Sequence, residues 1–289
     1  MDNLDPDLIS VVVPCFGMGR FIGKALSSIE TQTHTSWEVI VIDDGGPDDG
    51  TSESVKVFAE RHPGQRVEFR RLAENKGVSA ARNTGASMAK GSLLAFLDPD
   101  DLWREDHLES HLTRHRVEAA AVVTTSRAEV FRGDNPDQVQ GEWGYTDWEK
   151  SIFPRSLALR NVIIPSTVVM PAEYFREVGG FDETRSLQHT EDWDLWIRLV
   201  ESGLEFCFLE QFTVLYRRHD GGATADRRLM RVRVQEFSSK NHERLFTDLG
   251  LSVSSLAFRV DALESRLNWL QRNPFIRLIS AIQKLLKKK

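Results

Sequence analysis

The chain has 289 residues, of which 40% are hydrophobic and 28% are charged. This is an ordinary globular composition with enough apolar material for a sizeable core, and the length predicts one large domain or one domain with an appendage. The formal net charge of −6 gives no reason to expect nucleic acid as a partner, because domains that bind nucleic acid carry excess positive charge.

Three features predict a cytoplasmic location. The two cysteines, Cys15 and Cys207, are too few for a disulfide framework, fit a reducing compartment and form no CxxC zinc pair. No apolar run approaches the roughly 20 residues that span a bilayer. The acidic start of the chain, MDNLDPDL, lacks the apolar region of a signal peptide.

Strand-like and helix-like segments alternate over the first 125 residues. The strand-like runs lie at 9–14, 37–43, 67–72, 92–98 and 120–125, and the helix-like segments lie at 20–33, 51–62, 78–90 and 104–118. Runs 9–14, 37–43 and 92–98 are almost continuously apolar, which is typical of strands buried on both faces of a parallel sheet. The alternation predicts right-handed βαβ units and a doubly wound, mostly parallel α/β sheet.

The second half of the chain is less regular. Residues 126–165 are expected to form a long loop region, and an apolar strand is predicted at 161–170. A helix is expected at 190–203, and the runs LEFCFL and FTVLYRRH predict two further strands.

From about residue 226 onward the sequence predicts helix. Leucines and a valine recur at alternating four- and three-residue spacing over 256–270, which indicates either a helix packed on the rest of the protein or a homodimer seam. Residues 274–289 are amphipathic and basic. They are either a solvated tail or an interfacial helix that binds anionic lipid at the membrane surface.

Acidic residues follow the buried run 92–98, where a ligand would bind, because ligands of such sheets lie at the carboxyl ends of the strands. Asp98 and Asp100 flank Pro99, and carboxylates on one short turn can hold a hard divalent cation. The alternative is that they cap the helix expected at 104, and for Asp101 capping or bracing is the favoured interpretation.

The other strand ends carry further polar candidates. Asp43 and Asp44 could accept hydrogen bonds from a nucleobase or ribose, or could simply form the turn before Gly45. In the segment NKGVSAARN, a helix start could bind phosphate. Arg82 in the same segment could bind a phosphate or pair with a strand-end aspartate. No Walker A or G-x-G-x-x-G motif is present, which argues against P-loop and ordinary dinucleotide chemistry.

A third acidic group opens the helix expected at 190–203. Glu191 and Asp192 lie in its first turn, where either could act as a general base or could complement the helix dipole. His219 ends the YRRH segment and is either a metal ligand or a surface histidine.

These motifs occur in the order ISVVVPCFGMGR, WEVIVIDDG, DGT, ENKGVSAARN, SLLAFLDPDDLW, GGFDE, EDWDLWIRL and YRRH. Together they resemble the large family-2 group of inverting glycosyltransferases with the GT-A fold, over roughly residues 9–220. The resemblance implies a nucleotide-diphosphate sugar donor and a divalent metal, Mn²⁺ or Mg²⁺. It also implies a catalytic domain at 1–225, with a donor half at 1–125 and an acceptor half at 126–225. The helical extension expected at 226–289 lies outside the resemblance.

The resemblance also implies roles for individual residues. Asp192 would be the catalytic base beside Glu191, Asp100 and His219 would bind the metal, and GGFDE (179–183) would border the acceptor site. The residues that would line the donor nucleotide are Pro14, Cys15, Phe16, Asp43, Asp44, Asn75, Lys76, Gly77, Arg82 and Asp98.

The implied reaction is transfer of a sugar to a glycan or lipid-linked acceptor, in cell-surface polysaccharide synthesis at the inner face of the membrane. Two alternatives remain: a non-catalytic module that binds nucleotide sugar or glycan, and a sugar nucleotidyltransferase. The chain departs from the family pattern at Gly46 and Pro47, where relatives carry Ser-Thr, and at Gly17, where they carry Asn. Both changes lie in the donor-side loops and bear on nucleotide choice.

Overall fold

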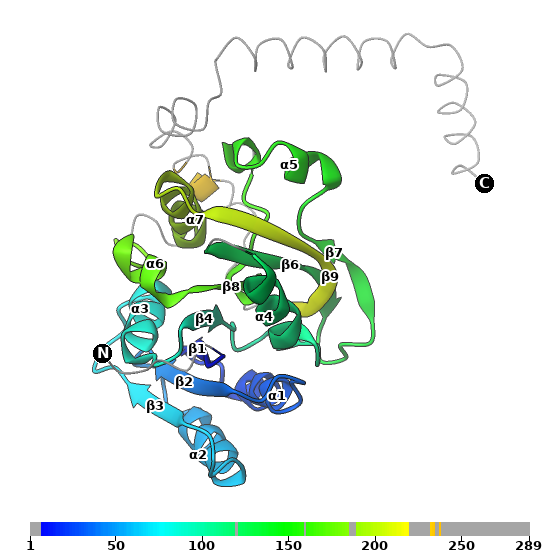
Figure 1. Ribbon diagram of the computed structural model, residues 1–289. Coiled ribbons are helices and arrows are strands. Elements are labelled where there is room, and N and C mark those ends of the chain that lie inside the picture. Colours follow the sequence, from blue (N-terminus) through cyan, green and yellow to red (C-terminus); the bar gives the residue numbers. More distant parts are fainter. Residues whose placement is uncertain are drawn as a thin grey trace, which may run out of the picture. The chain divides into compact units, whose positions relative to one another are not determined.

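The described residues form one mixed sheet with helices on both faces (Figure 1). The computed structural model describes residues 7–118, 121–158, 160–184, 189–219, 232–234 and 237. In this part of the chain the strand order is β3-β2-β1-β4-β8-β6-β9-β5, with β7 beside β6.

The strands are β1 (Ile9–Cys15), β2 (Trp37–Asp43), β3 (Val67–Arg71), β4 (Leu93–Phe96), β5 (Leu102–Trp103), β6 (Val122–Arg132), β7 (Val139–Trp143), β8 (Val168–Pro171) and β9 (Glu205–Arg218). The α-helices are α1 (Gly19–Glu30), α2 (Thr51–Arg61), α3 (Val78–Met88), α4 (His107–Val117), α5 (Asp147–Ser151), α6 (Ala172–Glu177) and α7 (Glu191–Glu201). Short 3₁₀ helices occur at η1 (Arg155–Ala158) and η2 (Pro165–Thr167).

The first four strands are parallel, as the sequence predicts. β1 pairs with β2 and with β4, and β2 pairs with β3. α1 and α2 cover one face, where Val11 and Val39 lie, and α3 covers the other, where Ile40 and Ile42 lie. Because both faces are covered, every residue of β1, β2 and β4 is buried, which explains their continuous apolar sequence.

The second half of the sheet is mixed. β8 runs antiparallel to both β4 and β6, β9 runs parallel to β6, and β5 runs antiparallel to β9. β1 to β4, β6 and β9 therefore point in one direction, and the predicted doubly wound, mostly parallel sheet is confirmed. The carboxyl ends of these strands define the edge at which the acidic residues lie.

The structure corrects the sequence-based elements after residue 125. The expected loop region at 126–165 contains the rest of β6, all of β7, α5 and η1; β7 is an exposed strand without apolar alternation, so its sequence carries no strand signal. The strand expected at 161–170 is limited to β8, because Pro165 starts η2 and proline cannot donate to a sheet ladder.

The two strands expected after residue 203 are one long strand, β9. Thr125 of β6 lies opposite Phe208, and Arg127 lies opposite Phe212. The polar residues Glu210 and Gln211 therefore lie in a bulge of a continuous strand, not in a turn between two strands.

The C-terminal predictions lie almost wholly outside the described residues. Of the extension expected at 226–289, only 232–234 and 237 are described, so the proposed dimer seam at 256–270 and basic tail at 274–289 stay predictions. None of the helices in the described ranges combines the length and apolarity needed to cross a bilayer.

Candidate active site

The turn after β1 presents an exposed aromatic ring at the carboxyl edge of the sheet. Cys15 pairs with Asp43 of β2, and Phe16, the next residue, is 49% exposed. The Cys15 thiol is buried, and burial together with the Asp49 and Asp43 carboxylates raises its pKa to about 12. The thiol is therefore inert at neutral pH, and the Phe16 ring is the accessible part of this turn.

Asp43 and Asp44 shape the loops that surround them. Asp43 accepts hydrogen bonds from Arg71 Nε at 2.7 Å and from the Gly46 backbone at 2.9 Å. The two oxygens of Asp44 accept the backbone N–H groups of Lys76 and Gly77, both at 2.8 Å. Asp43 therefore has the turn-forming role, and Asp44 holds the segment of Lys76 beside the end of β2. Contact of either carboxylate with a nucleoside stays a prediction.

Arg82 connects two acidic groups at the centre of the site. Its side chain is buried, with Nη2 2.7 Å from Asp98 Oδ1 and Nη1 3.0 Å from Glu191 Oε1. Burial alone would lower the pKa of Arg82, but the Asp98 and Glu191 carboxylates raise it above its ordinary value. Of the two roles considered for Arg82, the structure shows the ion pair with a strand-end aspartate. The guanidinium joins α3 and the end of β4 to the start of α7, and Glu191 lies 109 residues from Arg82 in the sequence.

The three carboxylates of the DPDD turn point to different partners. Asp98 pairs with Arg82, and Asp100 Oδ2 lies 3.0 Å from His219 Nε2. Asp101 is fully buried and accepts the Ser166 hydroxyl at 2.7 Å and the Arg217 backbone N–H at 3.0 Å. Burial, followed by the charges of Asp100 and Asp98, raises the pKa of Asp101 well above its usual range. The bracing role predicted for Asp101 is confirmed.

Asp100 and His219 fit a divalent cation. Burial and the nearby Asp98 charge raise the pKa of Asp100, so a cation beside it would relieve an existing electrostatic cost. The Asp100 carboxylate suits Mn²⁺ or Mg²⁺ when substrate phosphates and water complete the shell, whereas the His219 imidazole suits a transition metal better than Mg²⁺. Within the described ranges no group of three or more His, Cys, Asp or Glu side chains is arranged to hold a metal.

The acidic pair on α7 divides into a buried and an accessible member. Glu191 is buried, with Oε1 on Arg82 and with no hydrogen-bond partner for Oε2 among the described residues. Asp192 is half-buried and accepts the Trp193 backbone N–H at 2.8 Å and the Asn161 amide at 2.9 Å. Burial and the Glu191 charge raise the pKa of Asp192 to about 7. Asp192 is therefore the member that can exchange a proton near neutral pH.

The GGFDE loop is held against α3. Asn83 donates its amide to the Phe181 carbonyl and the Glu183 carboxylate, both at 2.8 Å, and accepts the Phe181 backbone N–H at 2.9 Å. Gly180 has φ 70°, and a Cβ there would lie 2.6 Å from Asn83 Oδ1. A side chain at this position would therefore displace the loop from α3.

Comparison with known proteins gives the family. Residues 10–179 match the protein-family model described as Glycosyl transferase family 2. The chain belongs to this family. A solved structure of the mannosyltransferase PcManGT from Pyrobaculum calidifontis, in complex with GDP-Man and Mn²⁺, is similar at a TM-score of 0.62 and 18% identity, covering 96% of this chain and 84% of that one. The Staphylococcus aureus TarS fragment 1–349 with UDP-GlcNAc is similar at a TM-score of 0.58 and 17% identity, covering 78% and 66%. The GT-A fold is thereby confirmed.

Two curated relatives differ in how much of their length this glycosyltransferase spans. One is TuaG of Bacillus subtilis strain 168, which is named as a teichuronic acid biosynthesis glycosyltransferase. It is 29% identical, and the match covers 75% of this chain and 81% of the length of TuaG. Chondroitin synthase of Escherichia coli is 29% identical over 68% of this chain but only 27% of its own. The second relative therefore contains much that has no counterpart in the match.

Three residues beside the candidate site were not singled out from the sequence: Asn161, Ser166 and Arg217. Asn161 bonds Asp192, and Ser166 bonds both Asp101 and the Asp98 backbone N–H. Arg217 is buried between the rings of Phe21 and Phe131, and it donates Nε to the Asp100 carbonyl at 2.7 Å. The only signal for Arg217 was its place in YRRH, and nothing in the sequence distinguishes the other two.

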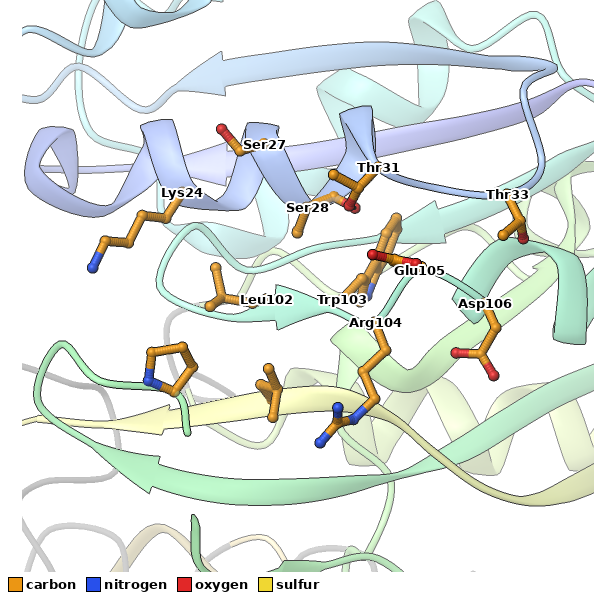
Figure 2. A pocket seen from close by; sticks show the side chains of 12 residues that line it. Lys24, Ser27, Ser28, Thr31, Thr33, Leu102, Trp103, Arg104, Glu105 and Asp106 are labelled. Carbon is orange, nitrogen blue, oxygen red and sulfur yellow. The ribbon is translucent and has the colours of Figure 1, made fainter. Parts of the chain in front are cut away.

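A groove of about 720 Å³ is lined by other residues. Figure 2 shows side chains that line it. The groove lies between α1, residues 102–106 (which include β5) and β9. Its lining residues are Lys24, Ser27, Ser28, Thr31, Thr33, Leu102, Trp103, Arg104, Glu105, Asp106, Pro136 and Leu215. None of the predicted site residues is among them, so the groove is not the strand-edge site.

Proposed function

We propose that this family-2 glycosyltransferase moves a sugar from a nucleotide-diphosphate sugar to an acceptor hydroxyl, with inversion of the anomeric centre. The observation that carries the proposal is the setting of Asp192. Its carboxylate is half-buried, its pKa is raised to about 7, and its neighbour Glu191 is tied through Arg82 to Asp98 at the strand edge. A general base is thus held beside the position where a donor sugar would lie.

The donor would lie along the carboxyl ends of β1, β2 and β4. The exposed Phe16 ring and the segment Asn75–Gly77 would border the base, with Pro14, Cys15, Asp43 and Asp44 shaping those walls, and Asp98 would reach the ribose. The similar structures are complexes with UDP-GlcNAc and with GDP-Man, which supports a nucleotide-diphosphate sugar as the donor class.

Asp100 and His219 would hold a divalent cation at this edge. The bound cation would neutralise charge that develops on the departing diphosphate. The two side chains lie within hydrogen-bonding distance of each other, so both already point at one place.

Proton transfer falls to Asp192. A new bond forms between the acceptor oxygen and the anomeric carbon as the bond to the diphosphate breaks, through a transition state like that of glycoside hydrolysis. The acceptor hydroxyl is a poor acid, so Asp192 must take its proton while the new bond forms. Attack from the face opposite the diphosphate inverts the anomeric centre.

The names of two relatives support a role in cell-surface polysaccharide synthesis. TuaG is named for teichuronic acid biosynthesis, and the second relative is named chondroitin synthase. We therefore propose a glycan or lipid-linked acceptor, met at the inner face of the membrane, with peripheral contact through 274–289. Vesicle flotation of the full chain and of the chain ending at residue 273 tests this contact, and equal flotation would contradict it.

The deciding experiment is a donor screen with UDP-, GDP- and dTDP-sugars, followed by NMR of the product anomer. We expect one donor class to be consumed and the anomeric configuration to invert. Asp192→Asn should lower kcat by at least about 100-fold, the usual contribution of a general base, while nucleotide binding persists. Full turnover by this variant would remove Asp192 from the base role.

A further inference from the structure

We infer that Asn161 is a positioning residue for Asp192: its side-chain amide fixes the orientation of the carboxylate and stabilises the ionised form. This inference rests on the proposed function, because it assigns a partner to the proposed base. Asn161 lies in none of the motifs that place the chain in its family, and it reaches the site from the segment between η1 and η2.

The direction of the Asn161 amide is determined by its own backbone. Asn161 Oδ1 accepts the N–H of Ile163 at 3.1 Å, which is an Asx turn. Because the carbonyl side of the amide is used in this way, the NH₂ group must face the other way, and it lies 2.9 Å from Asp192 Oδ2.

The turn itself is held on both sides. Arg160 pairs with Glu149 of α5, and the Ile163 carbonyl accepts Trp196 Nε1 of α7 at 3.1 Å. The Asn161 amide therefore contacts α7 from a segment that is already held in place before a substrate binds.

The charges around Asp192 show which groups stabilise its ionised carboxylate. Glu191 on the same helix repels the ionised carboxylate, and Arg82 from α3 attracts it but is already bonded to Asp98 and Glu191. Apart from Arg82, the groups that stabilise the ionised form are the Trp193 backbone N–H and the Asn161 amide. The backbone N–H donates to Oδ1, so among the described residues the Asn161 amide is the donor that holds Oδ2 and with it the rotation of the carboxylate.

Loss of the amide should therefore raise the pKa of Asp192. Asn161→Ser keeps a side-chain oxygen for the turn but is too short to donate to Asp192, and we expect a rise of about one pH unit. Asn161→Asp is nearly isosteric and keeps the turn, but it replaces the donor with a second negative charge. It should raise the pKa further, with the two carboxyls titrating as a pair.

The test is a ¹³C-carboxyl NMR titration of Asp192 in the full chain, with the signal assigned from its absence in Asp192→Asn. The readout does not depend on a donor or an acceptor. Asn135→Ala is the matched control, because Asn135 Oδ1 also accepts a backbone N–H two residues on, at 3.0 Å from Asp137, but in an exposed loop. The control should leave the Asp192 titration unchanged.

The pH profile of kcat then links the titration to catalysis. We expect the acid limb for Asn161→Ser to move upward by the same shift as the NMR titration, with the rate recovering at high pH. A purely structural defect would lower the rate at every pH. An unshifted Asp192 titration in both Asn161 variants would overturn the inference. A shifted titration with an unshifted acid limb would support the contact and contradict instead the base role proposed for Asp192.

Discussion

At the scale of single residues, the DPDD turn shows how like charges are kept on one short segment. Asp98 is paired with Arg82, Asp100 with His219, and Asp101 with the hydroxyl of Ser166. Three carboxylates at the end of a buried strand would repel one another if they shared an environment. Each has a different partner, so the turn can remain acidic and ordered at once.

The Arg82 bridge predicts a large stability effect. In Arg82→Met, the Glu191 carboxylate stays buried without its cation and Asp98 loses its partner. We expect a loss of about 3–5 kcal/mol in the free energy of unfolding, measured by urea titration, because breaking one side of a buried pair leaves an uncompensated charge.

A surface pair supplies the control for this prediction. Arg61 lies 2.8 Å from Glu30, and its side chain is 48% exposed. Arg61→Met should cost no more than about 1 kcal/mol, as exposed ion pairs generally do. Equal losses for the two variants would contradict a special role of the buried bridge.

At the scale of elements, α3 lies unusually close to β1. A Cβ at Gly85 would lie 2.4 Å from Val12 Cγ1, so α3 can approach the sheet only with glycine at this position. The same helix carries Arg82 and Asn83, which reach the Asp98 carboxylate and the GGFDE loop. Close packing of α3 therefore sets the reach of both side chains.

Two glycine substitutions test this packing. Gly85→Ala should destabilise the protein by about 1–3 kcal/mol through overpacking. Gly23→Ala, on α1 with no atom within 4 Å of the added Cβ, should stabilise by about 0.5–1 kcal/mol because alanine favours helix. Urea unfolding of both variants gives the signs, and the same sign for both would show that the contact with Val12 is not decisive.

α4 carries histidines at every fourth position: His107 and His111 are buried, and His115 is partly buried. The Thr213 hydroxyl donates to Ser126, so His107 Nδ1 must be the donor in its 2.7 Å contact with Thr213. His107 Nε2 and His111 Nε2 are buried without partners among the described residues. All three rings are therefore packed in the neutral state.

This row predicts that the protein is sensitive to acid. Burial lowers the pKa of His107 to about 3 and of His115 to about 4, and burial with the two neighbouring rings lowers that of His111. Unfolded histidine titrates near 6.5, so the stabilising effect is complete above about pH 6.5 and is lost as the pH falls toward the folded values. Each ring should contribute about 1.4 kcal/mol of loss per pH unit.

Urea unfolding across this pH range checks the sign and the size. His111→Gln removes one titrating ring, and it should reduce the slope of the unfolding free energy with pH by about 1.4 kcal/mol per unit. A slope equal to that of the parent protein would contradict the interpretation.

At the scale of the whole described unit, the proposed site joins segments from both halves of the sheet. Asp100 follows β4 and His219 follows β9, and the loops proposed to bind the donor follow β1 and β2. A ligand that contacts all of them stabilises the folded state by mass action. We therefore expect UDP or GDP with Mn²⁺ to raise the melting temperature, and Asp100→Ala to abolish the part that depends on Mn²⁺. A Mn²⁺-dependent increase that survives in this variant would contradict the metal assignment.

The local sequence determined the parallel half of the sheet and the site segments that follow its strands. Continuous apolar runs such as 37–43 are typical of strands that are covered on both faces, and helical spacing on α1 marks a face that covers them. For the same reason Asp44, Asp98 and Asp100 could be assigned to one edge, since parallel strands place their carboxyl ends together.

Only the tertiary structure decided which side chains meet within that edge. Asn161 and Asp192 are 31 residues apart, Arg82 and Glu191 are 109 apart, and Asp100 and His219 are 119 apart. No local pattern encodes such pairs, because each partner is chosen by the packing of elements and not by spacing along the chain. The same holds for β7 and for the bulge in β9. Their polar residues are part of strands because both strands form backbone hydrogen bonds with β6.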